Sequence, residues 1–187
     1  MKQILIIYGP PYSGSSHTGL QIADYYKGVS LSVSDLMRKE VREKSKLGSL
    51  LSSYIQKGQV IPLSVTEQLL YESFKQHQNE ELLVFINFPK NTSEAESVAE
   101  IAPLFGYQNI NTVSLVINEQ MIIERMQQAN THDVEAIWEK LESYYTNISF
   151  VINHYEETGI LQVIDFSENV NFLVEEISKS TGLKGTS

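Results

Sequence analysis

Five short runs of apolar residues, rich in β-branched and aromatic side chains, alternate along this chain of 187 residues with longer amphipathic stretches. Near-continuous apolar runs of this length are typical of strands that are buried on both faces. Strands that alternate with helices favour a parallel sheet, because each parallel crossover is long enough to contain a helix. The pattern therefore predicts an α/β fold with a five-stranded parallel sheet covered by helices on both faces. The strands are expected at residues 4–8, 29–31, 82–88, 112–117 and 160–166.

Helical periodicity fills the stretches between these strands. Because segment 33–78 contains helical patterns alone, it is expected to be an inserted helical subdomain rather than a simple crossover. Ligands of parallel sheets bind at the carboxyl ends of the strands, so site residues are expected in the loops that follow them. The expected helices cover residues 17–27, 35–57 with a break near Gly48, 64–77, 93–103, 119–129, 133–157 and 168–180.

The composition excludes several classes of function. Fourteen basic residues against 23 acidic ones give a net charge of −9, which argues against nucleic acid or an anionic membrane as a partner. The absence of cysteine excludes disulfides and cysteine–zinc sites, and the four histidines lack metal-ligand spacing. The apolar run at the N-terminus is too short for a signal peptide or a membrane span. We therefore expect a cytoplasmic monomer without a metal site.

The stretch "YGPPYSGSSHTGL" (8–20) follows the first strand and has the glycine spacing of a phosphate-binding loop. Such loops direct backbone N–H groups and the N-terminus of the next helix at a phosphate. The residue after Gly14 is Ser15, where such a loop carries its lysine. The sequence therefore indicates a degenerate phosphate loop made of Gly9, Gly14, Ser15, Ser16 and His17.

This loop and four further segments resemble, in order and spacing, those of the adenylate kinases of the short-lid type. "GPPYSGSSHT" is similar to GPPGxGKGT, and "LSVSDLMRKEV" to ISTGDxLRxEV. "KLGSLLSSYIQKGQVIPLSVTEQLL", "INFPKNTSEAE" and "KLESYYTNISFVINHYEETGILQVID" follow in the family's order. The resemblance implies one domain, 1–187, with a P-loop core (1–32, 79–128 and 133–187), a helical nucleoside-monophosphate (NMP)-binding subdomain (about 33–78) and a very short, vestigial lid (about 129–133).

The resemblance also implies roles for individual residues. Arg38, Ile61, Lys90 and Glu94 stand at positions of the monophosphate side, where Glu94 replaces a glutamine that reads the adenine edge. On the ATP-base and lid side stand Arg125, aligned with an arginine that stacks on adenine, and Lys140, aligned with a lid-side arginine. A lysine keeps the charge but lacks the planar fork of an arginine.

Several substitutions remove groups on which the family's chemistry depends. Phosphoryl transfer needs cations and donors placed around the moving group, and Ser15 supplies no positive charge. Tyr12 replaces a glycine where the backbone must approach phosphate closely. Ile86 stands at the position of an aspartate that orients hydrated Mg²⁺, which an isoleucine cannot do. Ordinary turnover is therefore not expected.

Three interpretations remain. The first is a pseudoenzyme that has lost phosphotransferase activity and acts as a weak nucleotide-binding or regulatory module, with AMP or another nucleoside monophosphate, or an unidentified protein, as its partner. The second is an active NMP kinase that converts ATP and AMP to two ADP with a non-standard loop, and it alone requires ATP and Mg²⁺. The third is a structural interaction protein that binds no nucleotide.

Overall fold

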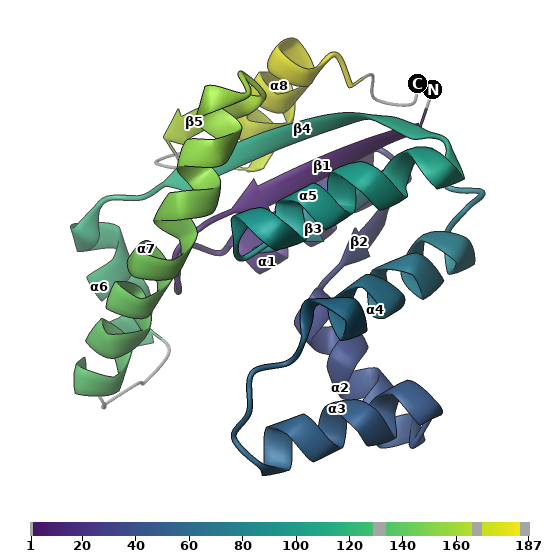
Figure 1. Cartoon of the computed structure of the whole chain (residues 1–187). Coiled ribbons are helices and arrows are strands. Elements are labelled where there is room, and N and C mark those ends of the chain that lie inside the picture. Colours follow the sequence, from purple (N-terminus) through teal and green to yellow (C-terminus); the bar gives the residue numbers. More distant parts are fainter. Residues whose placement is uncertain (1, 129–133, 166–169, 184–187) are drawn as a thin grey trace.

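The computed structural model describes residues 2–128, 134–165 and 170–183 (Figure 1). Its five strands form one sheet in the order β2-β3-β1-β4-β5, and all four pairings are parallel. The prediction of a five-stranded parallel sheet is confirmed. The strands are β1 (Lys2–Tyr8), β2 (Val29–Leu31), β3 (Leu82–Ile86), β4 (Tyr107–Val116) and β5 (Leu161–Asp165).

Strand β1 lies at the centre of the sheet and is covered on both faces. Ile4, Ile6 and Tyr8 point into an apolar cluster with side chains of α4 (Leu63–Gln76), α5 (Thr92–Ile101) and α7 (Val134–Glu157). Leu5 and Ile7 point the other way, into a cluster with α1 (Ser15–Tyr25) and α8 (Val170–Thr181). All five side chains are fully buried. The near-continuous apolar run thus reflects a strand between two helical layers.

The remaining helices extend this core. A 3₁₀ turn, η1 (Ala102–Phe105), links α5 to β4, and α6 (Glu119–Gln128) follows β4. The helices α2 (Val33–Glu43), α3 (Lys46–Gln56) and α4 lie between β2 and β3, within the segment that was expected to be an insertion. Helices α2 and α3 project beyond the sheet in Figure 1, whereas α4 packs against the core. The predicted lid, 129–133, lies outside the described residues. Among the helices described, none is long and apolar enough to cross a membrane.

The break within the predicted helix 35–57 falls at Lys44 and Ser45, so its expected place near Gly48 was wrong. Lys44 adopts a left-handed conformation with φ 52°, and the Ser45 hydroxyl caps α3 by accepting from the Gly48 N–H at 2.8 Å. Gly48 instead lies inside α3, where a Cβ would come within 1.9 Å of the Glu40 carbonyl oxygen. The glycine therefore marks a close crossing of α2 and α3.

Strand β4 begins at Tyr107, five residues before the predicted start of 112–117. Exposed polar residues, Gln108 and Asn109, follow the buried Tyr107 and hide the strand from an apolar pattern. Pairing with β1 nevertheless extends over the whole segment, from Lys2 opposite Tyr107 to Tyr8 opposite Ser114.

Substituting Gly48 by alanine tests the helix crossing. Gly48→Ala is expected to destabilise the protein by about 1–3 kcal/mol, because the new methyl group meets backbone atoms of α2 and the two helices must move apart. Urea unfolding followed by circular dichroism measures the change. The matched control is Ser49→Ala, at an exposed neighbour in the same helix. An equal effect of both substitutions would contradict the close crossing.

Candidate functional site

Several backbone N–H groups of the loop between β1 and α1 donate hydrogen bonds to acceptors within the loop. The Ser13 N–H donates to the Pro10 carbonyl at 3.0 Å, and the Ser15 N–H donates to the buried Ser13 hydroxyl at 3.2 Å. Gly14, the N-cap of α1, has φ 83°. A phosphate loop offers free amides to its ligand, and here two of those amides are already bonded within the loop.

Asn87, the residue after β3, joins the two ends of this loop. Its Oδ1 accepts from the Gly9 N–H at 3.0 Å, and its Nδ2 donates to the Ser15 hydroxyl at 3.1 Å. The Ser15 hydroxyl in turn donates to the Gly9 carbonyl at 3.5 Å. The three residues form a closed ring of hydrogen bonds. Sequence analysis did not select Asn87, because it placed this residue inside the strand expected at 82–88, whereas β3 ends at Ile86.

Tyr12 and Arg125 stabilise the other side of the loop through packing and hydrogen bonds. Tyr12 has φ 66°, a left-handed conformation that a non-glycine residue adopts at a cost, and its side chain packs against an apolar cluster. Arg125, from α6, donates from Nη1 to the Tyr12 carbonyl at 3.2 Å and also to the Ser13 carbonyl. The guanidinium therefore contacts loop backbone. The cluster under Tyr12 consists of Ile117, Ile122, Met126, Ile137 and Leu141.

A cavity of about 850 Å³ opens over this loop. It is bordered by the first turn of α1, by the residues after β3 and by one face of α7. Helix α1 has no side-chain N-cap hydrogen bond and no acidic residue in its first turn, so its N-terminal amides and dipole favour an anion. Of the predicted site residues, the structure brings together at this cavity Gly9, Gly14, Ser15, Ser16, His17, Lys90 and Lys140.

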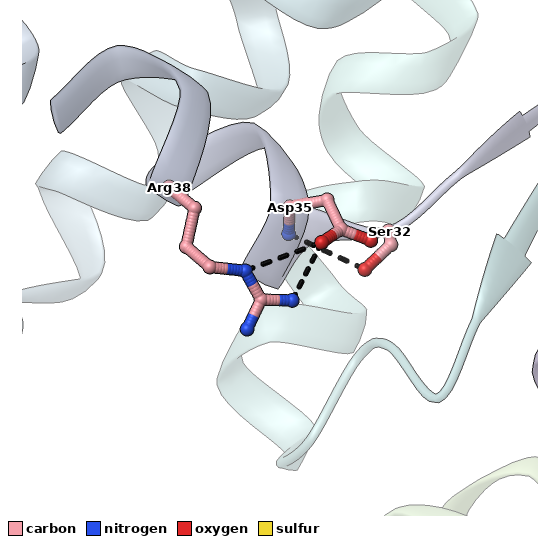
Figure 2. A network of polar contacts seen from close by, with 3 residues as sticks. All are labelled: Ser32, Asp35 and Arg38. Atoms are coloured by element: carbon pink, nitrogen blue, oxygen red, sulfur yellow. Dashed lines mark hydrogen bonds and ion pairs between the residues drawn. The ribbon is translucent and has the colours of Figure 1, made fainter. Parts of the chain in front are cut away.

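Arg38, on α2, does not border that cavity. Its Nε and Nη2 donate to Oδ1 of Asp35 at 3.2 and 2.5 Å, as Figure 2 shows. The Asp35 N–H donates to the hydroxyl of Ser32, the N-cap of α2, at 3.3 Å. The hydrogen bond from Arg38 holds the pKa of Asp35 below its usual value. Both side chains are about two-thirds exposed, so in this arrangement Arg38 serves a surface ion pair.

Glu94 acts at the start of α5. Its Oε2 accepts from the Lys90 N–H at 2.7 Å, while its own N–H donates to Oδ1 of Asn91, the N-cap, at 2.9 Å. The pattern is a variant of the capping box, in which the glutamate accepts from the residue before the N-cap instead of from the N-cap itself. Burial raises the pKa of Glu94, and the Lys90 N–H partly opposes that rise.

The space beside Glu94 is small. A cavity of about 40 Å³ lies there, bordered by Val33, Met37 and Phe88, which is room for about one water molecule and not for a nucleobase. Ile61 lies outside it, half-buried against the core. In this conformation, four residues expected on the monophosphate side are therefore not gathered around one open pocket.

The residues that the structure describes around the loop do not fit a magnesium site. Ile86 is buried, and its side chain packs so closely on α1 that a Cβ on Gly19 would lie 2.7 Å from its Cδ1. Asp35 is bonded to Arg38. Within the described ranges, no group of three or more histidine and acidic side chains could hold a metal ion.

The capping role of Glu94 predicts a pH dependence of stability. A carboxyl whose pKa is raised by folding binds its proton more tightly in the folded state. Its contribution is therefore fully present below the unfolded pKa and is lost as the pH rises through the folded pKa. Glu94→Gln has no proton to lose, so its stability relative to the unchanged protein should increase as the pH rises above the unfolded pKa of about 4.3. Urea unfolding at several pH values measures this difference.

The control for that experiment is Glu96→Gln, an exposed glutamate of the same helix. The same increase in the control would show that the pH dependence does not come from Glu94. A loss of stability of Glu94→Gln relative to the unchanged protein as the pH rises would show that folding does not raise the pKa of Glu94.

Two substitutions of Asn87 separate its hydrogen bonds from its backbone conformation, which has φ 49°. Both Asn87→Gly and Asn87→Ala remove the bonds to Gly9 and Ser15, but only alanine pays the steric penalty of the left-handed region. Asn87→Ala should be less stable than Asn87→Gly by about 1 kcal/mol, measured by urea unfolding. Equal stability of the two variants would contradict a steric penalty at position 87, because both lack the ring and they differ only in the Cβ.

Comparison with known proteins identifies a family with the glycine loop and parallel sheet described above. A family model described as adenylate kinase matches residues 7–160. An adenylate kinase of Methanosarcina mazei is 21% identical over 92% of this chain and 95% of its own length. One of Azobacteroides pseudotrichonymphae is 25% identical over 91% and 93%, and UMP-CMP kinase 3 of Arabidopsis thaliana is 25% identical over 93% and 86%. The chain belongs to the adenylate kinase family.

Proposed function

We propose that this chain is a pseudoenzyme of the adenylate kinase family, which binds the phosphates of a nucleotide weakly and does not transfer them. The observation that carries the proposal is the bonding of Ser15. Its hydroxyl is held between the Gly9 carbonyl and the Asn87 amide, so the residue that follows Gly14 brings neither charge nor a free donor to the cavity. Phosphoryl transfer depends on such charge in the transition state.

Weak binding is supported by what remains in the cavity. Lys90 and Lys140 border it together with the N-terminal turn of α1, and a hydrogen bond between charged groups contributes about 1.5–3 kcal/mol. Lysine supplies a point charge and lacks the two-pronged grip of arginine. The cavity can therefore attract phosphates without aligning them for transfer.

The class of ligand rests on the relatives, whose names are adenylate kinase and UMP-CMP kinase. The monophosphate side offers fewer free groups to AMP, because the Glu94 carboxylate is bonded to the Lys90 N–H and Arg38 is paired with Asp35. The net charge of −9 and the lack of cysteine support a cytoplasmic monomer that does not bind nucleic acid.

Calorimetric titration with ATP, AMP and the bisubstrate analogue of two adenosines joined by five phosphates tests binding, and a coupled assay for ADP tests transfer. We expect weak binding of ATP, with a Kd of about 0.1–1 mM, and no ADP formation. Ser15→Lys alone should not restore turnover, because Ile86 still replaces the acidic residue. Tight binding of the analogue, or ADP formation, would favour an active kinase.

The assay needs a control for traces of a host kinase. Any ADP formation belongs to this chain only if Lys90→Met and Lys140→Met, which remove the two cations at the cavity, reduce it. Activity that is the same in all variants comes from a contaminant. No heat with any of the three ligands would overturn nucleotide binding and favour the structural interaction protein.

A further inference from the structure

We infer that the cavity over the loop takes its phosphate ligand as a metal-free anion, so that Mg²⁺ weakens binding instead of supporting it. This inference rests on the proposed function, namely that a phosphate-bearing nucleotide binds in this cavity. It goes further by stating the ionic form of the ligand, and it follows from the mismatch between the residues present and a magnesium site.

Mg²⁺ is held in phosphate sites by one or two carboxylates, by phosphate oxygens and by several waters in an octahedron. Among the residues that border the cavity, the carboxylate is that of Glu139, and the next residue in α7 is Lys140. At the end of β3, Ile86 presents a branched apolar side chain pressed against Gly19. A hydrated cation finds neither oxygen ligands nor space there.

The hydroxyl of Ser15 and the carboxylate of Asp35 are also engaged. The Ser15 hydroxyl both donates and accepts within the ring with Gly9 and Asn87. Asp35 borders a separate groove of about 330 Å³, to which Ser16 also contributes. Its carboxylate is paired with Arg38 at 2.5 Å, and two further cations, Lys39 and Arg42, border that groove. This side of the loop therefore carries an excess of positive charge, which repels a divalent cation.

The same charges favour the free anion. ATP carries a charge of about −4 at neutral pH, and its magnesium complex about −2, so the attraction to Lys90, Lys140 and the positive end of α1 is roughly halved by the metal. Among the described residues that border the cavity, Glu139 is the one carboxylate and it is followed by Lys140, so bonds from this part of the chain to Mg²⁺ do not compensate for the lost attraction.

Calorimetric titration of the full chain with ATP, once with a chelator and once with excess MgCl₂, tests the inference. NaCl keeps the ionic strength equal, because screening alone weakens such binding. We expect the Kd to rise by about three- to tenfold in Mg²⁺. Lys140→Met should weaken binding of free ATP by about tenfold and reduce the effect of Mg²⁺. Lys57→Met, an exposed lysine at the end of α3, is the matched control and should change neither.

The outcomes separate this inference from the function on which it rests. A Kd that is equal or lower in Mg²⁺ overturns the inference and leaves nucleotide binding intact. Equal losses in Lys140→Met and Lys57→Met also overturn it, because the attraction would then be diffuse. The absence of heat in both buffers overturns nucleotide binding and the inference together.

Discussion

The burial of β1 on both faces is the constraint on which this structure depends. Residues 4–8 are fully buried, so their N–H and C=O groups must be paired within the sheet, and β3 and β4 supply the partners in parallel register. Parallel pairing brings the carboxyl ends of β1 and β3 to one edge. Gly9 and Asn87, which follow these two strands, consequently meet there. The position of the site is thus set by the core, before any ligand is considered.

At that edge, the loop is held by the protein's own side chains. The Ser13 hydroxyl accepts from a loop amide, Asn87 bridges the loop ends, and Arg125 donates to two loop carbonyls. The left-handed conformation of Tyr12 costs about 1–2 kcal/mol, which burial of its ring against α6 and α7 offsets. A loop whose polar groups already have partners needs no phosphate to hold its shape.

Apolar runs and helical periodicity were sufficient to predict the sheet, because a strand buried between two layers is apolar at nearly every position. They failed where contacts are specific. Gly48 was read as a break, although its missing Cβ permits a helix crossing. The glycine loop, Lys90 and Lys140 were expected on different sides of a nucleotide site, and in the structure they border one cavity. The partners of Arg38 and Glu94 could not be predicted, since residue type specifies a charge but not its neighbour. Asn91 three residues before Glu94 was a capping signal that went unused.

The residues at which this chain departs from the family's motifs are matched by local contacts. Ile86 fills space that Gly19 leaves open, the Ser15 hydroxyl is bonded to Asn87, and the Glu94 carboxylate is bonded to the Lys90 N–H. An aspartate at position 86 would bury a charge against α1, and a lysine at position 15 would break the ring with Gly9. Each of these substitutions therefore disrupts an existing contact, and we expect it to lower the stability of the fold whether or not it restores catalysis. The fold is kept by one set of residues and the chemistry by another, so a sequence can lose the second while conserving the first.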